Sequence, residues 1–538
     1  MINLYTLPGL AFNSPSLSVP LIKGYLKENN ITTKQYDLTQ KFFERCVNSN
    51  YLKKHKSKYY NSLKLDEKSI IDNIDKSIQY MKSRRINTDK IIDSNEIILE
   101  YLKIYGNCYN IIWNKKGLSF NTQLDTIDKV IDYSLKMNSI IFDDLYDIKN
   151  LSDGDIVYMS IQQPFQLVFA LRFSKKIKEK SNKIKVIFGG DYITHIIANS
   201  EELMKKFKYI DSILFYGELK FLIELIDYYK NNSTSNISNV YLRKEEKIIK
   251  NKIEECNEYD KQKYIPTFEN LNLNGYLSNL KMVNMTLNYG CYHSKCKFCS
   301  RYYYYNGKGR YNLDKIFKLI KELYLNEKIE AIYFIDECVP PEILIKLANF
   351  LIHNNIKIKW MVETRIDKKL LDKRISKLLY ESGLREISFG IESISKKVLQ
   401  SMDKRIEIND AKEIMKNFYL SGISVSGTFM IGYPTENFVD RYRTLRFIKK
   451  FKYIDTFGLG VFTYMRNSIL VNESDLDVSK DLNLIYRLNN DKYDDYMNLI
   501  RKFNNTKKIK KYSEIRNKIL YRSEYMYLDR KKYSLNFK

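Results

Sequence analysis

The sequence has few of the residues that interrupt regular structure, and it has no long apolar run. Its 538 residues include only 8 prolines and 19 glycines, while 44% of all residues are hydrophobic. This composition excludes a disordered or collagen-like chain and indicates a globular protein of about three domains. No uninterrupted apolar stretch approaches the roughly 18 residues that a membrane-spanning helix needs. The opening residues, MINLYTLPGLAFNSP, also lack the basic and apolar regions of a secretory signal.

Cysteine is scarce as well. The chain has 7 cysteines, of which Cys46, Cys108, Cys256 and Cys338 each stand alone in the sequence. An odd number with this scatter argues against a disulfide scaffold and predicts a reducing, cytoplasmic location. An oxygen-sensitive metal group would be stable there.

Negative charge is in deficit. Lys and Arg number 90 against 64 Asp and Glu, which gives a formal net charge of +26. Most of the excess is Lys, and it accompanies abundant Asn, Ile and Tyr, a joint bias that an AT-rich genome produces. Runs such as KKFKY and RKKYS are more typical of solvated surfaces than of nucleic-acid grooves. We therefore expect nucleic acid to be an unlikely partner, and RNA modification remains a second hypothesis.

The three other cysteines lie together in the segment NYGCYHSKCKFCS, at Cys291, Cys296 and Cys299. With His293, which lies between the first two, they could form a closed tetrahedral zinc site. Alternatively, each thiolate could bind one iron of a four-iron cluster and leave the fourth iron open. The sequence has no second pair of closely spaced cysteines, which a zinc site of this kind usually has.

Two series of alternating strands and helices organise the chain. The first series starts with INLYTL, breaks off near residue 38, resumes at DIVYMSI and ends near residue 230. Its strands, about five in number, predict a doubly wound parallel sheet that binds ligands at the carboxyl ends of the strands. The polar stretch of residues 39–150 has helical periodicity and is predicted to be a helical insertion in this domain.

The second series follows a predicted linker at residues 231–280 and covers residues 281–455. About five strand–helix repeats predict a partial β/α barrel of the TIM type, and residues 456–538 predict a helical cap over its open side. The cysteine loop directly follows the first strand, and polar residues follow the later ones. Because this end of such barrels carries out the chemistry, the position favours an iron–sulfur cluster over zinc.

Taken together, these motifs resemble the radical S-adenosylmethionine (radical SAM) enzymes, specifically the branch with an N-terminal cobalamin-binding-like domain. The resemblance covers nearly the whole chain. It rests on GCYHSKCKFC, IYFIDE, FGIES, VLQSMDK and GTFMIGYPTE in the second series, and on DIVYMSIQQPFQLVFAL and VIFGGDYIT in the first. Two features depart from the family: the interval between the first two cysteines is one residue longer than usual, and no D-x-H-x-x-G offers a histidine to cobalt.

The resemblance implies that Cys291, Cys296 and Cys299 hold a four-iron four-sulfur cluster and that S-adenosylmethionine (SAM) chelates the open iron. An electron from a donor such as flavodoxin or ferredoxin would cleave SAM to a 5′-deoxyadenosyl radical, which abstracts hydrogen from the substrate. The implied SAM contacts are Phe298, Gly432, Tyr433 and Pro434 for the adenine, Asp336 and Glu337 for the amino group, Arg365 for the carboxylate, and Glu392 and Ser393 for the ribose. His195 and His293 are predicted to be ordinary loop residues. Cys338, two residues after Asp336, could contact the substrate or donate hydrogen, but it is predicted to be an ordinary thiol.

In the first domain, the resemblance implies a cobalamin site at the strand ends. The residues concerned are Ser160, Gly189, Gly190, Gly217 and Glu218. Their small side chains would let a large flat ring approach the backbone, although glycines at strand ends are also ordinary turn residues. The expected function is cobalamin-linked methylation, or another modification, of a peptide or natural product, as in the maturation of ribosomally made peptides. The alternatives are an RNA-modifying radical SAM enzyme without cobalamin and a non-catalytic, zinc-bearing nucleic-acid-binding protein.

Overall fold

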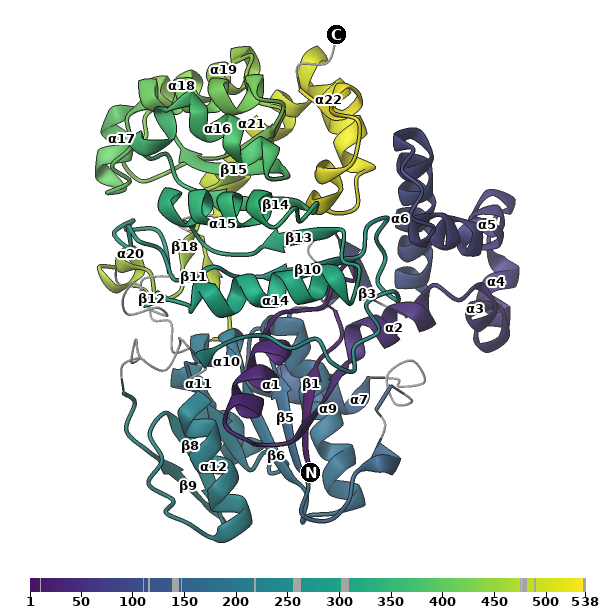
Figure 1. Cartoon of the computed structure of the whole chain (residues 1–538). Coiled ribbons are helices and arrows are strands. Elements are labelled where there is room, and N and C mark those ends of the chain that lie inside the picture. The colour runs from purple at the N-terminus through teal and green to yellow at the C-terminus, as the bar shows by residue number, and fades with distance from the viewer. Residues whose placement is uncertain are drawn as a thin grey trace. The chain divides into compact units, whose positions relative to one another are not determined.

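The computed structural model describes most of the chain as two compact units, traced in Figure 1. It describes residues 1–538 except 10, 110, 115–116, 138–144, 147, 217–218, 255–262, 301–308, 475, 477–480, 488–489 and 536–538. Unit 1 comprises Met1–Lys82, Ile97–Leu277 and Asp477–Leu484, and unit 2 comprises Ser83–Glu96, Ser278–Leu476 and Ile485–Lys538. Among the described residues, no helix combines the length and the apolar character needed to cross a membrane.

Unit 1 is built on a sheet with the strand order β2-β1-β5-β6-β7-β8-β9. The parallel strands are β2 (Thr33–Asp37), β1 (Ile2–Thr6), β5 (Ile156–Ser160), β6 (Lys185–Gly189) and β7 (Ser212–Leu214). Every residue of β1 and β5 is buried, as expected for a sheet covered on both faces. The strand order reverses between β1 and β5, and such a switch point is where open α/β sheets bind ligands. The predicted doubly wound parallel sheet is confirmed.

The helices that follow these strands are α1 (Ser18–Glu28), α9 (Pro164–Lys180), α10 (Asp191–His195), α11 (Ile197–Lys206) and α12 (Leu219–Asn231). The predicted insertion contains α2 (Leu38–Cys46), α3 (Ser49–His55), α4 (Ser57–Ser62), α5 (Leu65–Lys82), α6 (Thr88–Tyr109) and α7 (Ile127–Lys136). It is amphipathic, as its periodicity predicted: α5 buries Ile71, Ile74 and Met81 and turns its charged residues outward.

Two hairpins were not predicted. The strands β3 (Ile111–Asn114) and β4 (Gly117–Phe120) pair within the insertion. The strands β8 (Val240–Lys244) and β9 (Lys247–Lys250) extend the sheet of unit 1 in antiparallel fashion, within the stretch predicted as a linker. Strands this short give too few alternating positions for a period of two to be recognised.

Unit 2 is built on six parallel strands that pair in chain order. They are β10 (Met282–Met285), β13 (Ala331–Phe334), β14 (Lys359–Thr364), β15 (Leu384–Glu392), β16 (Ser424–Ile431) and β17 (Thr456–Val461). The connecting helices are α14 (Leu313–Leu325), α15 (Pro341–His353), α16 (Lys373–Glu381), α17 (Lys396–Ser401) and α18 (Ile408–Leu420), and α19 (Phe438–Lys450) leads to β17 (Figure 1). Because crossovers between parallel strands are right-handed, strands in chain order place all these helices on one face. This is the arrangement of the predicted partial barrel. A sixth strand, β17, lies in the stretch that was predicted to be part of the cap.

The two faces of this sheet differ in chemistry. On the helix-covered face, Phe389 packs edge-to-face on Phe418 of α18, with the ring centroids 5.6 Å apart. On the opposite face, the register aligns Glu363 of β14 with Ser388 of β15, and Ser388 with Ser426 of β16. Since side chains alternate along a strand, the free face of the sheet is polar along these central strands.

The C-terminal segment supplies a positive charge to this polar face. It consists of α21 (Asn490–Asn504), α22 (Lys507–Asn517), the 3₁₀ turn η4 (Arg522–Met526) and α23 (Arg530–Tyr533). From η4, Arg522 forms a bidentate contact with Glu386 at 2.9–3.1 Å and a second ion pair with Glu363. Glu386 is fully buried, and this burial raises its pKa to about 7 despite the guanidinium beside it. Arg522 is therefore the counter-charge on which a buried carboxylate depends.

Replacing Arg522 should destabilise unit 2. The variant Arg522→Ala leaves Glu386 buried without its partner, and we expect the free energy of unfolding to fall by about 3 kcal/mol. The control is Lys518→Ala, which removes a solvent-exposed pair with Glu96 and should cost about 0–1 kcal/mol. Denaturant unfolding of the full chain measures both, and equal losses for the two variants would contradict the assignment.

Candidate active site

The polar face of the unit 2 sheet ends in a cavity of about 180 Å³. Its walls bring together the three motif cysteines, Cys291, Cys296 and Cys299. They also include four of the predicted SAM contacts: Phe298, Glu337, Arg365 and Glu392. These residues come from the loop after β10 and from the carboxyl ends of β13, β14 and β15, so the parallel sheet is what gathers them.

The base of the cysteine loop is held by Asp336, which follows β13. Its carboxylate accepts the backbone N–H groups of Leu287, at 2.9 and 3.1 Å, and of Asn288, at 2.8 Å. The Asn288 side chain in turn donates to the carbonyl of Gly290, at 2.9 Å, and to that of Cys338, at 3.2 Å. Burial raises the pKa of Asp336 to about 7. Asp336 thus positions the loop, and of the predicted pair only its neighbour Glu337 lines the cavity.

The other side of the cysteine loop rests on a turn at residues 402–405, after α17. Lys297 donates its backbone N–H to the carbonyl of Met402 at 3.0 Å. His293 donates Nε2–H to the carbonyl of Asp403 at 2.6 Å, because a carbonyl can only accept. Burial lowers the pKa of His293 to about 4, so its ring is neutral. With Nε2 engaged in this way, His293 anchors the cysteine loop to the 402–405 turn.

Arg365 holds the same turn from β14. Its Nη2 donates to the carbonyls of Lys404, at 2.6 Å, and Arg405, at 3.2 Å. The Lys404 side chain turns into the cavity, where Nζ lies 3.0 Å from Oε1 of Glu392. Burial is the largest influence on the pKa of Lys404 and lowers it, but the charges of Glu392 and Cys296 and the hydrogen bond to Glu392 together raise the pKa above its usual value. The two side chains therefore form a charged pair in the cavity wall.

Glu392 has a left-handed backbone conformation, with φ of +65°, where the pairing of β15 with β16 shifts register. Such a conformation costs a non-glycine residue on the order of 1–3 kcal/mol and is concentrated at functional sites. Two residues earlier, Gly390 leaves the necessary space: a Cβ there would lie 2.9 Å from both Glu392 Oε1 and Lys404 Nζ. The backbone at the end of β15 therefore has the conformation and the space that the Glu392–Lys404 ion pair requires.

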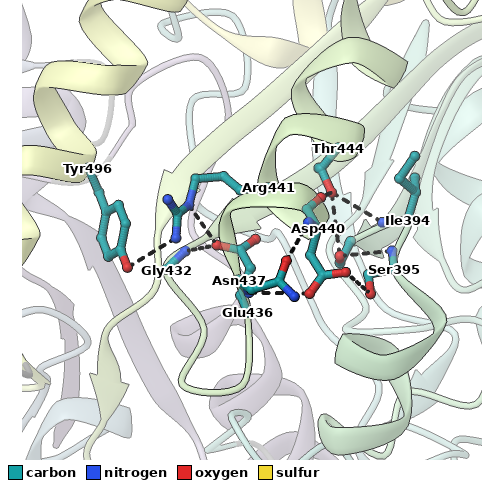
Figure 2. A network of polar contacts seen from close by, with 10 residues as sticks. Ile394, Ser395, Gly432, Glu436, Asn437, Asp440, Arg441, Thr444 and Tyr496 are labelled. Atoms are coloured by element: carbon teal, nitrogen blue, oxygen red, sulfur yellow. Dashed lines mark hydrogen bonds and ion pairs between the residues drawn. The ribbon is translucent and has the colours of Figure 1, made fainter.

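The turn after β16 is organised by Glu436, as Figure 2 shows. Its Oε2 accepts the backbone N–H of Gly432 at 2.6 Å and the Nε–H of Arg441 at 3.0 Å. Arg441 also donates to the hydroxyl of Tyr496, at 3.2 Å. Gly432 has φ of +83°, and a Cβ there would lie 2.6 Å from the Tyr496 ring. Glycine is therefore required at Gly432 by both conformation and packing.

The remaining predicted SAM contacts do not line the cavity. Tyr433 belongs to a buried cluster against which Phe298 packs. Ser393 is fully buried, accepts the backbone N–H of Ser395 at 3.2 Å and has its hydroxyl 3.4 Å from that of Thr444. Pro434 is exposed. Phe298 thus connects the cavity to the turn after β16, whereas Gly432, Tyr433, Pro434 and Ser393 do not line the cavity itself.

In unit 1, the predicted cobalamin residue Ser160 lies at the switch point of the sheet. Its hydroxyl donates to Ser18 Oγ at 3.0 Å, which joins the end of β5 to the start of α1. Gly190 has φ of +105°, and a Cβ there would lie 2.4 Å from the carbonyl oxygen of Ile161. Packing within the unit thus accounts for this glycine. At Gly189, a Cβ would collide with the Tyr158 hydroxyl. Gly217 and Glu218 lie outside the described residues.

Several cavity residues were not among the predicted site residues, and three of them carry a thiol or a charged group: Cys338, Glu363 and Lys404. Cys338 follows a strand closely, and this position is a signal that could have marked it. The neighbouring Cys338 side chain lowers the pKa of Cys291. Glu363 lies near the carboxyl end of β14 and shares this signal, whereas Lys404 carries none, because most charged residues in turns after helices face solvent.

Comparison with known sequences places the site in a family. Residues 285–448 match the model of the Radical SAM superfamily. An uncharacterized methyltransferase of Pyrococcus horikoshii is 23% identical over 317 residues, which cover 58% of this chain and 67% of the relative. A putative methylthiotransferase of Methanocaldococcus jannaschii is 29% identical over 155 residues, which cover 28% of this chain and 32% of the relative.

Solved structures match across both units. The radical SAM methyltransferase TsrM of Kitasatospora setae, with cobalamin and a [4Fe-4S] cluster bound, has a TM-score of 0.55 at 11% identity, over 88% of this chain and 77% of its own. The cobalamin-dependent radical enzyme OxsB, with aqua-cobalamin and SAM bound, has a TM-score of 0.59 at 13% identity, over 96% of this chain and 71% of its own. At such identities the match shows the fold alone. The matched residues 285–448 include all three cysteines of this cavity, so the site lies in a domain that matches the Radical SAM superfamily.

Proposed function

We propose that this protein is a cobalamin-dependent radical SAM methyltransferase that modifies a peptide or a natural product. The observation that carries the proposal is the convergence of three cysteines with Arg365 and Glu392 in one cavity at the carboxyl end of a parallel sheet. Soft thiolates suit iron, and the neighbouring charged and aromatic groups suit a zwitterionic nucleoside such as SAM.

The donor set fits the implied cofactors. The thiols of Cys291, Cys296 and Cys299 would hold the cluster, which supplies the single electron that cleaves SAM. On the cavity wall, the Arg365 guanidinium suits the SAM carboxylate, and the Glu337 carboxylate suits the amino group. The chain itself contributes position: Asp336 and the 402–405 turn hold the cysteine loop from two sides, so the thiols need little reordering on loading.

The ion pair between Glu392 and Lys404 fixes the orientation of the Glu392 carboxylate in the cavity wall. Lys404 holds one oxygen of Glu392 at 3.0 Å, and each side chain is about 90% buried. A carboxylate oriented in this way can accept hydrogen bonds from the ribose hydroxyls without having to be reoriented on binding. Because both side chains are largely buried, they also limit the access of water to a reactive radical at this part of the wall.

The use of cobalamin is supported by unit 1. Its strand order places the switch point between β1 and β5, where Ser160 bonds to Ser18. TsrM and OxsB, which share the fold over most of this chain, have cobalamin bound in their structures. The described part of unit 1 lacks a D-x-H-x-x-G motif, so we propose that cobalt is bound without a protein imidazole below it.

Methylation is supported by the Pyrococcus relative, which is named an uncharacterized methyltransferase. For the substrate, we propose that the helical insertion from α2 to α7 recognises a peptide or a natural product, because this insertion is additional to the sheet that would hold cobalamin. The electron donor is proposed to be a flavodoxin or a ferredoxin.

Iron loading tests the cluster. After anaerobic reconstitution the protein should carry about four irons per chain and absorb visible light. Changing Cys291, Cys296 and Cys299 together to Ala should abolish both signals, whereas Cys108→Ala, a half-buried cysteine of α6, should keep them. Stoichiometric zinc without iron loading would refute the proposal.

Titration of the reconstituted protein with SAM tests Arg365. The variant Arg365→Ala should raise the SAM dissociation constant about 10- to 100-fold, because a charged hydrogen bond contributes about 1.5–3 kcal/mol. Its iron content should stay at the wild-type value. The control Arg385→Ala, near the opposite end of β15, should bind SAM normally. Unchanged affinity in Arg365→Ala would remove this residue from the SAM site.

Anaerobic binding of hydroxocobalamin tests the role of unit 1. We expect saturable binding, with a visible spectrum that shows no histidine nitrogen on cobalt. The triple cysteine variant should bind equally well, because the predicted cobalamin residues and the cysteines belong to different units. Absence of binding would favour a radical enzyme that works without cobalamin. A histidine-ligated spectrum would contradict the proposal that cobalt has no protein imidazole below it.

A further inference from the structure

Three cavity residues on the polar face of the unit 2 sheet lie apart from the predicted SAM carboxylate contact, Arg365. They are Glu363 of β14, Ser388 of β15 and Thr428 of β16, and we call them the inner group. Glu363 aligns with Ser388 in the strand register, and Thr428 aligns with Gly390, two residues after Ser388. Glu363 also lies two residues before Arg365, which is about 7 Å along a strand. The inner group is therefore offset from Arg365 along β14 or across the sheet.

Glu363 has one carboxylate oxygen that the described part of the chain does not use. Its two described side-chain contacts, from the Tyr333 hydroxyl at 3.4 Å and from the Arg522 guanidinium, are both made to Oε1. No described residue donates a hydrogen bond to Oε2, and 40% of the Glu363 side chain is exposed. Arg522 also makes three hydrogen bonds to Glu386, so two carboxylates share one guanidinium. Glu363 thus keeps an accessible acceptor for a ligand.

The two hydroxyl groups of the inner group are also available to a ligand. Ser388 is only 2% exposed and lines the cavity, yet its hydroxyl forms no hydrogen bond with any residue that the structure describes. The hydroxyl of Thr428, on the neighbouring strand, likewise has no hydrogen-bond partner in the described chain. Because buried hydroxyls in folded proteins are nearly always hydrogen-bonded, an unpaired one in a cavity wall indicates a partner that enters the cavity.

Next to Thr428, the sheet leaves space on the cavity side. Thr428 aligns with Gly458 of β17, where a Cβ would lie 3.8 Å from Thr428 Cγ2. Two residues later on the same face, a Cβ on Gly460 would have no described atom within 4 Å. Neither glycine has a positive φ, so neither backbone conformation nor packing requires glycine at these positions. They leave room for a ligand that extends along the sheet past Thr428.

We propose that the inner group binds a positively charged nitrogen group of the substrate, an ammonium or a guanidinium, with Glu363 as its counter-charge. The inference rests on the proposed function, since it assigns the substrate class of the same cavity. An ionised carboxylate can only accept hydrogen bonds, and a charged donor gives it the stronger bond. The hydroxyls of Ser388 and Thr428 can accept further N–H groups of the same ligand. In a peptide such a group is a lysine or arginine side chain, and in a natural product it is an amino group.

The two cationic side chains that line the cavity do not take the place of this ligand. Arg365 donates to the backbone carbonyls of Lys404 and Arg405, and the Lys404 ammonium is paired with Glu392. Neither forms a described hydrogen bond or ion pair with Glu363. A cation that reaches the free oxygen of Glu363 therefore has to come from the ligand.

The competing role for Glu363 is a contact with SAM itself, whose amino group is also cationic. Glu337, the predicted partner of that amino group, lines the cavity as well. The two roles differ in what a neutral replacement of Glu363 weakens. If Glu363 binds the substrate, its replacement affects a cationic probe and leaves the affinity for SAM unchanged. If it binds SAM, the affinity for SAM falls.

Equilibrium dialysis with small cationic probes tests the inference. The probes are Nα-acetyl-lysine amide and Nα-acetyl-arginine amide, and the neutral comparison is Nα-acetyl-norleucine amide, which has the apolar part of the lysine side chain without its ammonium. The reconstituted full chain, with SAM and without reductant, should bind at least one cationic probe saturably. Its dissociation constant should be about 10- to 100-fold lower than that of the neutral probe, as expected for a hydrogen bond to a charged group. Comparison of the two cationic probes distinguishes an ammonium from a guanidinium.

Two cavity variants and a matched control complete the test. Glu363→Gln keeps the size of the side chain and removes its charge, so the preference for the cationic probe should disappear. Ser388→Ala should weaken binding of that probe about 2- to 10-fold. Both variants should keep the iron content and the SAM affinity of the wild type. The control Glu342→Gln, which replaces an exposed carboxylate of α15 that pairs with Lys369, should bind every probe as the wild type does.

Three results would overturn the inference. The first is a wild type that binds no cationic probe saturably, or binds the neutral probe equally well. The second is a preference for the cation that survives in Glu363→Gln or is lost equally in Glu342→Gln. The third is a weaker affinity for SAM in Glu363→Gln, which would assign Glu363 to SAM. A wild type that loads no iron or binds no SAM refutes the proposed function, and because these two measurements use no probe, the two failures are distinguishable.

Discussion

The site of unit 2 depends on one constraint, the right-handed crossover between parallel strands. Six strands that pair in chain order send every connecting helix to the same face, so no connecting helix buries the other face. The helix-covered face accordingly carries aromatic residues such as Phe389, and the free face carries Glu363, Ser388 and Ser426. The cavity forms where this polar face meets the carboxyl ends of the strands.

A buried polar face lowers the stability of a protein unless its charged groups have partners of opposite charge or hydrogen-bond partners. Each buried charge of this face has a partner from another element. Glu386 is paired with Arg522 of the C-terminal segment, and Glu392 with Lys404 of the 402–405 turn. Asp336 is stabilised by backbone N–H groups at the base of the cysteine loop. The same contacts that neutralise these charges also fix the walls of the cavity, so stability and preorganisation have a common origin.

Unit 1 uses the parallel sheet in a different way. Its strand order reverses once, between the paired strands β1 and β5. The reversal creates a switch point at the carboxyl ends of these strands and requires no particular side chain there. The glycines at the end of β6 are explained by contacts with Tyr158 and Ile161 and do not themselves identify a ligand. The proposal of cobalamin binding is supported by the switch point between β1 and β5, together with the fold shared with TsrM and OxsB.

The sequence by itself determined the two parallel sheets and the cysteine loop, because apolar periodicity and close spacing are local properties that can be read along the chain. It also placed Glu337, Arg365 and Glu392 near strand ends, since strands end where their apolar runs end. The short hairpins β3–β4 and β8–β9 and the sixth strand β17 were missed because few residues in each alternate in character. Only the tertiary structure decided that Asp336 faces the backbone of the cysteine loop, and that Lys404 and Cys338 face the cavity. Those orientations depend on strand register and on buried partners far away in the sequence, which no local pattern encodes.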